Sequence, residues 1–422
     1  MQSNVYIVGI GMTAFGKHPG KSVKQLTAEA VRAALADAGC DAAAIEAAWF
    51  GNVGQGAIEG QHGVRGQLAL SGLGFEGIPV INVENACASS STALNAAQTY
   101  LRAGLADVVM AVGCEKMCVD DRSKVASVFD GCWDVHSARQ ALGALTDVSR
   151  EMIPEGAGNA GAASRSVFMD IYAALARKHM QTFGTTARQI AAVSAKNHQH
   201  SALNPLAQFR NAMSVDEVLA ARAIVWPLTL PMCSPVSDGA SAVIVCTEAA
   251  LTRFDRKRAV KLMASVVASG SRRTLDEYEK HVCHLAAKRA YDQAGIGPED
   301  ISLAEVHDAT AFAEIVQSEN LMFCAFGDGG PLAESGATAL GGRIPINTSG
   351  GLESKGHPIG ATGLAQIYEL ATQLRHEAGA RQVPDARFAI AENGGGFYGI
   401  EEAATCVTIL GRNDLIVRQG AI

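Results

Sequence analysis

The fold of this chain is decided by the stretch Glu84-Asn85-Ala86-Cys87-Ala88-Ser89-Ser90-Ser91-Thr92. An apolar extended run (residues 78–83) precedes it, and the small apolar residues of 93–104 that follow have the spacing of a buried helix. This pattern predicts a strand, a tight turn and a helix, with Cys87 at the bend and the helix beginning in the serines. Backbone N–H groups and the positive end of a helix dipole favour a thiolate at such a place. Cys87 is therefore a candidate nucleophile, and the alternative is a buried, unreactive cysteine.

Apolar strands and amphipathic helices alternate on both sides of this stretch. Residues 5–11 and 108–113 are apolar runs of the kind found in buried sheets, and 22–39 has the period of an amphipathic helix that stops at Gly39. The strand at 5–11 ends in Gly9-Ile10-Gly11, which lacks the third glycine of a dinucleotide fingerprint. We therefore expect an α/β fold without a nicotinamide site.

The pattern changes between residues 118 and 210. Helical periodicity covers 168–183 and 186–200, and a strand signal returns only at 240–246. Excursions of this length from an α/β fold usually form a binding wall or a lid, so we predict an insertion lying over the sheet.

A second half, from about residue 260, repeats the first. The helix predicted at 285–295 resembles the one that ends at Gly39, and His307 follows Gly295 at the spacing at which Gly51 follows Gly39. Such a duplication implies two βαβ-rich halves packed about a pseudo-dyad, with their equivalent loops converging. We expect an N-terminal half of residues 1–117 and 211–258, an inserted loop domain of 118–210, and a C-terminal half of 259–422. Cys87, His307 and His357 would then share one site.

Cysteine and histidine spacing gives no metal site. None of the ten cysteines forms a CxxC pair, so no zinc ribbon is expected within this chain. Cys114 and Cys118 are spaced to pack on one turn of a helix. His198 and His200 would point away from each other on a helix, so we expect surface or interface histidines rather than ligands.

Composition and charge exclude several classes of partner. Charged residues are 18% and hydrophobic residues 48% of the 422 residues, which is typical of a compact α/β protein. The net charge of -7 argues against binding to nucleic acid or to an anionic membrane surface. No apolar run approaches the length of a membrane span. Residues 1–4 show no leader pattern and 419–422 no peroxisomal signal, so we expect a cytoplasmic protein.

With these motifs in place, the chain resembles the thiolase family along its whole length, in particular the sterol-carrier-protein type. The motifs that carry the resemblance are Asn85-Ala86-Cys87-Ala88-Ser89, Ser237-Asp238-Gly239-Ala240, Val306-His307-Asp308, GGLESKGHPIGATG at 350–363, and Gly394-Gly395-Gly396. The resemblance implies the thiolase fold, in which two duplicated halves form five αβαβα layers with an inserted loop domain.

The resemblance also implies roles for the site residues. Cys87 would attack the 3-keto carbon of a 3-oxoacyl-CoA, and His357 would remove the thiol proton. The helix N-terminus and the imidazole are expected to lower the pKa of the thiol. His307 would donate to the thioester oxygen, while the backbone N–H groups of Cys87 and Gly396, in the loop 394–396, would form an oxyanion hole. Coenzyme A is then a substrate, and no cofactor is bound permanently.

One departure from the family concerns the group that transfers a proton at C2 of the leaving acyl-CoA. Thiolases usually carry a second cysteine, either in a Cys-x-Gly motif near the C-terminus or directly after His-Asp. Here those places read Ala391-Glu392-Asn393-Gly394-Gly395-Gly396 and His307-Asp308-Ala309-Thr310, without cysteine. Glu392 or Asn393 occupies the C-terminal place, and of the two only Glu392 is itself an acid or base.

The His-Asp-Ala pattern is similar to a thiolase subgroup that works with a small subunit built from a zinc ribbon and an OB-fold. The resemblance therefore implies such a partner on a homodimeric core, and branched, aromatic or steroid-derived substrates, of which benzoylsuccinyl-CoA is one. CoA is expected near Ser234 and Ser237, which are alternatively ordinary turn formers. Acyl specificity is expected from residues 128–133 and 152–163.

Three rival functions are considered. A retro-aldolase acting on a 3-hydroxyacyl-CoA would not need a nucleophilic cysteine, so the presence of Cys87 weighs against it. A ketosynthase shares a Cys-His-His set, but the Gly-His-Pro context at 356–358 is that of thiolases. A non-catalytic CoA-ester-binding subunit would not need an intact set of Cys87, His307 and His357.

Overall fold

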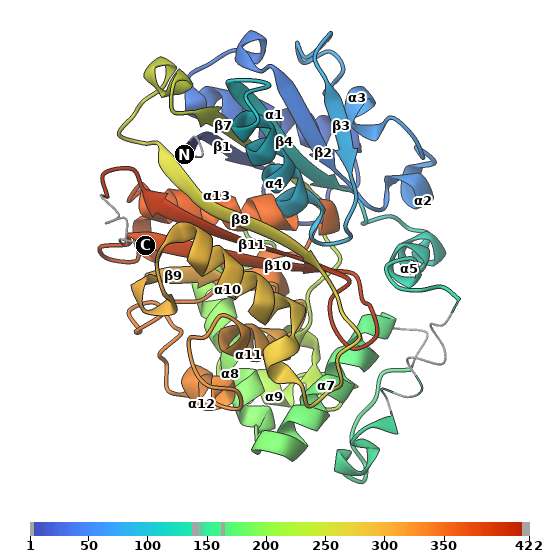
Figure 1. Ribbon diagram of the computed structural model, residues 1–422. Helices are drawn as coiled ribbons and strands as arrows, with labels where there is room; N and C mark the ends of the chain where they lie inside the picture. The colour runs from blue at the N-terminus through green and yellow to red at the C-terminus, as the bar shows by residue number, and fades with distance from the viewer. Residues whose placement is uncertain (1–3, 137–142, 144, 146, 162–164, 416–422) are drawn as a thin grey trace.

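The computed structural model describes residues 4–136, 143, 145, 147–161 and 165–415. Its centre is a nine-stranded sheet (Figure 1). In sheet order the strands are β3 (Val80–Val83), β2 (Ala47–Gly51), β4 (Val108–Glu115), β7 (Gly239–Thr247), β1 (Val5–Met12), β8 (Val260–Ser269), β11 (Ala404–Arg412), β10 (Phe388–Gly395) and β9 (Leu303–Glu305).

The strand order has the symmetry that the duplication predicts. Read outward from the β1–β8 junction, the first half runs β1-β7-β4-β2-β3 and the second β8-β11-β10-β9, with an isolated bridge from Ala304 to Ile346 in the place of a fifth strand. In both halves the inner pairs are antiparallel and the outer pairs parallel. Within the sheet, as far as the structure describes it, the two half-sheets are joined by the pairing of Tyr6 and Ile7 with Lys261 and Val260.

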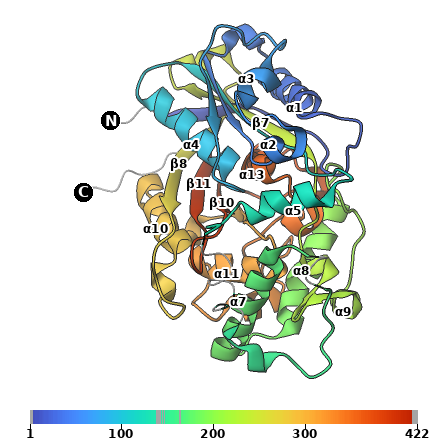
Figure 2. The same ribbon diagram turned by 90° about the vertical axis from the view of Figure 1, so that its right-hand side faces the viewer.

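Helices cover both half-sheets and fill the space between them (Figures 1 and 2). The helices of the two halves are α1 (Val23–Ala38), α2 (Gln55–Glu59), α3 (Arg65–Leu70), α4 (Ser89–Arg102), α10 (Val282–Ala294), α11 (Ala311–Asn320), α12 (Gly329–Glu334) and α13 (Thr362–Leu374). α1 packs on the outer face of the first half-sheet, α10 on that of the second, and α4 and α13 lie between the two half-sheets. This is the predicted five-layer arrangement.

The helix boundaries follow from capping residues in the sequence. Ser22 begins α1 with a reciprocal capping box to Gln25, and Gly39 ends it in the left-handed conformation. α4 begins at Ser89, directly after the bend that carries Cys87. α13 follows a single turn at Ile359–Ala361, and a π-helical turn at Gly351–Lys355 precedes His357.

Between β4 and β7 lie helices that cover one end of the molecule. They are α5 (Arg122–Asp130), α7 (Val167–Phe183), α8 (Ala187–Ala202) and α9 (Val215–Ala220), with a small hairpin of β5 (Ala223–Val225) and β6 (Leu228–Thr229). α8 packs on α11 and α12 of the second half (Figure 1). Among the described helices, none is both long and apolar enough to cross a bilayer.

Two local predictions were wrong. Cys114 lies on strand β4 and Cys118 in the loop after it, so they do not share a helical turn. His198 and His200 are on α8 as expected, but both are buried rather than at the surface. The His200 Nδ1 contacts the Asn347 carbonyl at 3.0 Å, and its Nε2 accepts from the Leu340 N–H at 3.1 Å. The helix is covered on this face by the second half of the chain.

Candidate active site

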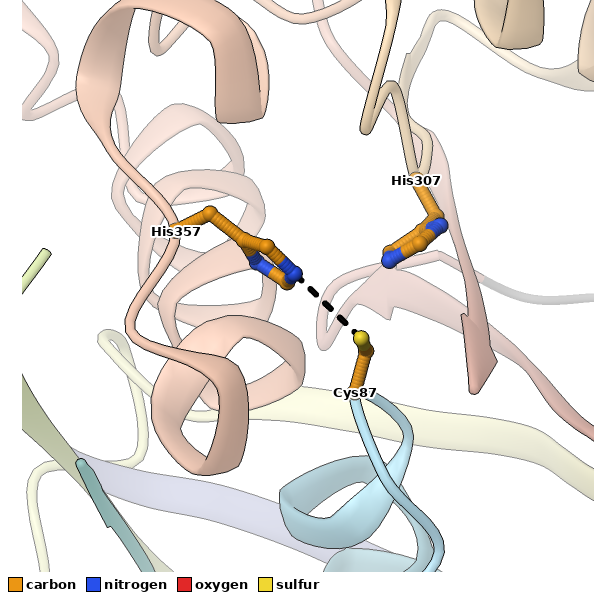
Figure 3. Close-up of side chains that lie close together, drawn as sticks. All are labelled: Cys87, His307 and His357. Carbon is orange, nitrogen blue, oxygen red and sulfur yellow. Dashed lines mark hydrogen bonds between the residues drawn. The ribbon is translucent and has the colours of Figure 1, made fainter. Parts of the chain in front are cut away.

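Three loops from distant parts of the sequence bring Cys87, His307 and His357 together (Figure 3). Cys87 precedes α4, His307 follows β9, and His357 lies between the π-helical turn and α13. The Cys87 Sγ is 3.3 Å from the His357 Nε2, and the two imidazole rings are 5.3 Å apart in an edge-to-face arrangement. All three side chains meet where the middle helix layer ends.

The bend at Cys87 is held by the residues that flank it. Ala86 has a φ of 46°, an uncommon value for a residue with a side chain. Its N–H donates to the Glu84 carboxylate at 2.7 Å, and the Ser89 hydroxyl donates to its carbonyl at 2.6 Å. These bonds hold a sharp turn that presents the Cys87 side chain at the N-terminal end of α4.

The hydrogen bonds of His357 determine which ring nitrogen carries a proton. Its Nδ1 is 2.6 Å from the Thr362 hydroxyl, and that hydroxyl donates its own proton to the Pro358 carbonyl at 3.0 Å. The Thr362 oxygen must therefore accept from the Nδ1–H of His357, which leaves Nε2 unprotonated. The lone pair of Nε2 then faces the Cys87 thiol, as a general base requires.

Burial keeps both members of this pair neutral. It raises the pKa of the Cys87 thiol, with a further rise from Cys132, although the backbone N–H groups of Gly396 and Cys87 favour the thiolate. Burial, together with the nearby His307 and Lys355, holds the pKa of His357 well below its usual value. The thiol pKa is thus raised, contrary to the expectation from the helix N-terminus, because desolvation outweighs the dipole. The site holds a thiol and an imidazole, and the proton would move only when substrate is attacked.

His307 presents an imidazole without protein partners. It is buried, and neither ring nitrogen has a hydrogen-bond partner among the residues that the structure describes. Burial lowers its pKa to about 4, so the ring is neutral at pH 7. Its backbone N–H donates to the Glu392 carboxylate at 3.0 Å. A fixed, neutral imidazole with free nitrogens is suited to donating a hydrogen bond to a substrate oxygen.

Asp308 ties the His307 loop to the His357 loop. Its Oδ1 accepts from the Leu352 N–H at 2.7 Å, and its Oδ2 accepts from the Asn197 amide at 3.1 Å. Gly351 has a φ of 63°, and a Cβ there would lie 2.1 Å from Oδ2. Glycine is therefore required for this approach.

Gly396 supplies the second backbone donor near the thiol. It has a φ of 62°, and a Cβ on it would lie 2.8 Å from the Cys132 carbonyl. Its N–H and that of Cys87 both lower the pKa of the Cys87 thiol, which places them near the sulfur. Two such N–H groups form the geometry of an oxyanion hole.

Glu392 and Asn393 are engaged inside the protein. The Glu392 carboxylate accepts from the His307 N–H at 3.0 Å and from the Cys283 thiol and Thr405 hydroxyl, each at 3.3 Å. Asn393 accepts from the Ser91 hydroxyl on α4. A part for Glu392 or Asn393 in proton transfer stays a prediction. Neither the Glu392 carboxylate nor the Asn393 amide is hydrogen-bonded to Cys87 or His357.

The two serines predicted to contact CoA differ in how much of their surface is exposed to solvent. Ser237 is fully buried; its hydroxyl donates to Gln208 at 2.6 Å and accepts from the His357 N–H at 2.9 Å. It therefore holds the His357 loop in place. Ser234 is half-buried, and its N–H donates to the Ala309 carbonyl at 3.0 Å. Only Ser234 has surface to offer a ligand.

The sequence did not indicate the parts played by three residues: Thr362 as the partner of His357, Asp308 as the link between two loops, and Glu402 as a group packed against Gly394. The first two stand inside motifs already quoted, so their spacing from His357 and His307 offered a signal. Glu402 lies in no motif, and only the fold brings it against Gly394. The donor atoms of Cys87, His307 and His357 lie within 4.8 Å of one another and could also hold a metal ion. The thiol already faces the free nitrogen of His357, which is the arrangement of a nucleophile and its base.

Comparisons with known proteins find relatives over most of the chain. Residues 5–222 match the family "Thiolase, N-terminal domain" and 267–412 match "Thiolase C-terminal domain-like". The chain is 38% identical to sterol carrier protein 2 of Bos taurus, over 93% of this chain and 70% of that protein. It is 36% identical to an acetyl-CoA acetyltransferase of Methanothermobacter thermautotrophicus, over 94% and 97%. It is 33% identical to the benzoylsuccinyl-CoA thiolase subunit BbsB of Thauera aromatica, over 94% and 96%.

Solved structures share the fold. The Ltp2-ChsH2(DUF35) aldolase superposes with a TM-score of 0.76 at 22% identity, covering 98% of this chain and 99% of that chain. Human mitochondrial 3-ketoacyl-CoA thiolase in complex with CoA superposes with a TM-score of 0.69 at 17% identity, covering 97% and 98%.

Proposed function

Since the chain belongs to the thiolase family, we propose that it cleaves a 3-oxoacyl-CoA with free CoA into two acyl-CoA molecules, or runs the reverse Claisen condensation, through an acyl thioester on Cys87. Its relatives include acyltransferases, and it is an acyltransferase of this type. The observation that carries the proposal is the 3.3 Å contact between the Cys87 thiol and the His357 Nε2, whose other nitrogen is fixed by Thr362.

The geometry supports a sequence of steps. His357 takes the Cys87 proton as the sulfur attacks the 3-keto carbon, and the N–H groups of Cys87 and Gly396 bind the oxyanion. The C2–C3 bond then breaks, and its electron pair passes to the leaving acyl-CoA as an enolate, whose oxygen His307 binds. After C2 is protonated, CoA sulfur attacks the acyl-Cys87 thioester, and Cys87 leaves and takes its proton back from His357.

We propose a branched or aromatic 3-oxoacyl-CoA as substrate, with benzoylsuccinyl-CoA as one candidate. Support comes from the relative in Thauera aromatica, which is a benzoylsuccinyl-CoA thiolase subunit. Residues 128–133 are proposed to shape the acyl site, because Val128 and Phe129 of α5 pack in the same apolar cluster as Cys87. The other proposed segment is 152–163, of which Ala162 and Ala163 lie outside the described residues. CoA would bind as substrate, with Ser234 in contact, and no permanently bound cofactor is proposed.

We further propose a homodimeric core that works with a small zinc-ribbon/OB-fold partner, in the cytoplasm. The dimer is supported by β3, which is the outer strand of the first half-sheet and exposes Ile81 at 38%. Two similar proteins favour the partner: one relative is a thiolase subunit, and one structural neighbour is an aldolase that includes ChsH2(DUF35).

Thiolysis assays test the proposal. Purified chain, with and without a co-expressed partner, is given free CoA and a panel of 3-oxoacyl-CoA esters. We expect CoA-dependent formation of two acyl-CoA products and an acyl adduct on Cys87 by mass spectrometry. Cys87→Ala abolishes both.

The second candidate function is retro-aldol cleavage of a 3-hydroxyacyl-CoA, which the fold shared with an aldolase supports. It needs no acyl-enzyme, so cleavage without CoA that persists in Cys87→Ala would establish it and overturn the thiolase. If the chain binds CoA esters but catalyses neither reaction, it is a non-catalytic subunit.

A further inference from the structure

The proposed cleavage leaves one step without a group to perform it. When the C2–C3 bond breaks, the electron pair left on the acyl-CoA must be matched by a proton delivered to C2. His357 already holds the proton of Cys87, and His307 binds the enolate oxygen. Glu392 is occupied by the His307 N–H, the Cys283 thiol and the Thr405 hydroxyl. Protonation of C2 therefore needs a further acid.

Glu402 is a carboxyl group packed directly against the loop 394–396. It lies in the connection between β10 and β11 and is buried. A Cβ on Gly394 would lie 2.5 Å from the Glu402 Cγ and 3.3 Å from its Oε1. The carboxyl therefore fills the volume that a side chain at 394 would occupy, two positions before Gly396, whose N–H lowers the pKa of the Cys87 thiol.

One oxygen of this carboxyl is held and the other is free. Oε1 accepts from the Gln317 amide at 3.0 Å, whereas Oε2 is buried and has no hydrogen-bond partner within the described part of the chain. The Nε2 of His281 lies 3.5 Å from Oε2. An orphaned carboxyl oxygen in the interior is costly unless it serves a function or carries a proton.

The surroundings of His281 exclude a metal site here, although the donor atoms of His281, Cys283 and Glu402 lie within 4.8 Å of one another. The His281 Nδ1 accepts from the Cys283 N–H at 3.2 Å and contacts the Asn320 amide nitrogen at 3.3 Å. With Nδ1 accepting, the ring proton is on Nε2 and points toward Glu402. The ring has no lone pair to offer a cation at this point.

A cavity connects Glu402 with the outside. It measures about 30 Å³ and is lined by Glu402, Tyr172, Gln317 and Phe397, the residue that follows Gly396. His281 also lines it and a neighbouring cavity of about 70 Å³, which reaches Lys178. Lys178 is partly exposed, so the pair of cavities offers a route for protons from solvent to Glu402.

Charge in the interior keeps a proton on this group. Burial and the nearby Glu401 raise the pKa of Glu402, and burial together with Glu402 raises the pKa of Glu392 to about 8. Two carboxyls this close retain a proton between them near neutral pH, which an acid catalyst requires.

We propose that the Glu402 carboxyl carries the proton to and from C2 of the acyl-CoA, in the role that a second cysteine has in other thiolases. In cleavage, the carboxylic acid gives its proton to C2 as the enolate forms there. The carboxylate regains a proton from solvent through the two cavities, and the incoming CoA gives up its thiol proton to solvent. The CoA thiolate then attacks the acyl-Cys87 thioester. In condensation the steps reverse. This inference rests on the proposed thiolase function and names a residue for it.

The test separates proton transfer from acyl transfer. C2 hydrogen exchange of acetyl-CoA in D₂O needs the proton carrier, whereas transfer of the acetyl group from acetyl-CoA to Cys87 does not. We expect Glu402→Gln to lower C2 exchange and thiolysis at least about a hundredfold, because general acid–base groups contribute roughly 10²- to 10⁴-fold. Acetylation of Cys87 should stay within about threefold of the unaltered protein.

Two further variants keep the proposal falsifiable. Glu402→Asp retains a carboxyl group on a side chain one methylene shorter, so C2 exchange should fall about tenfold while acetylation of Cys87 stays unchanged. This variant also tests the proposal if Glu402→Gln does not fold. Glu392→Gln tests the rival carboxyl, which the sequence places in this role and which holds the His307 N–H at 3.0 Å. Exchange that survives in Glu402→Gln, or that is lost only in Glu392→Gln, overturns the proposal. If the unaltered protein forms no acyl-Cys87, the thiolase function fails first, and Glu402 loses its role with it.

Discussion

The reactivity of Cys87 depends on where a single proton sits on His357. The Thr362 hydroxyl gives its proton to the Pro358 carbonyl, so it can only accept from the His357 Nδ1–H. That bond leaves Nε2 free to act as the base for a thiol 3.3 Å away. A neutral pair of this kind avoids the cost of two buried charges before substrate arrives.

Replacing Thr362 by valine tests this arrangement. The variant keeps the side-chain shape but leaves the Nδ1–H without an acceptor, so the ring loses its orientation and preferred tautomer. We expect kcat/KM for thiolysis to fall by roughly ten- to a hundredfold, because an unsatisfied buried donor costs about 1–3 kcal/mol. Thr372→Val is the matched control: it lies on the same helix, and its hydroxyl donates to the Tyr368 carbonyl at 2.7 Å. Equal losses in both variants would contradict a specific role for Thr362.

The pH dependence of Cys87 alkylation tests the neutral pair itself. Burial raises the thiol pKa, so the thiolate is the minor form at pH 7 and its fraction grows as pH rises. His357 has a lowered pKa and is already neutral above pH 6, so it adds no inflection there. We expect the rate of inactivation by iodoacetamide to rise roughly tenfold per pH unit between pH 6 and 9. A plateau below pH 7 would instead show a thiolate–imidazolium pair.

Secondary-structure elements were predictable where local pattern and burial agree. The strand, bend and helix around Cys87, and the repeat that places His307 and His357 on equivalent loops, follow from apolar periodicity and glycine positions. The pattern did not predict that α8 would be covered by the second half, which buries His198 and His200. It also could not predict Glu402, because its approach to Gly394 depends on how the β10–β11 connection folds back. Long-range packing of this kind leaves no local signal.

The π-helical turn before His357 offers a prediction about an element. Gly351 has a φ of 63°, and a Cβ there would lie 2.1 Å from the Asp308 carboxylate; Gly379 has a φ of 59° with nothing within 4 Å. Gly379→Ala should cost about 1–2 kcal/mol through backbone conformation alone. Gly351→Ala should cost about 1–3 kcal/mol more through the clash, and should also slow thiolysis, because the His357 loop must shift. Urea unfolding of both variants measures the difference in free energy of unfolding. Equal losses would show that the Asp308 side chain moves away from the added methyl group without strain.

In the whole molecule, one core is shared by the two halves. Residues of both half-sheets contact α4 and α13 in a single buried cluster, while the two outer faces have clusters of their own. The three catalytic candidates come from both halves and lie at the end of this shared layer. The halves therefore need each other for the site to exist. The outer edge of the first half-sheet, by contrast, has no partner within the described part of the chain.

That edge leads to a prediction about assembly. β3 ends the sheet and has exposed positions at Ile81 and Asn82, and the exposed Val64 and Leu68 lie in and beside α3, which packs on β3. An unprotected apolar edge of this kind invites pairing with a second copy, and a charge on it opposes pairing. We expect Ile81→Lys to weaken the proposed homodimer by roughly 30- to 700-fold, the equivalent of about 2–4 kcal/mol for an interface hot spot. Leu105→Lys, at a position exposed at 62%, is the control and should leave the dimer intact. Light scattering after size exclusion measures both, and a dimer that withstands Ile81→Lys would place the interface on another face.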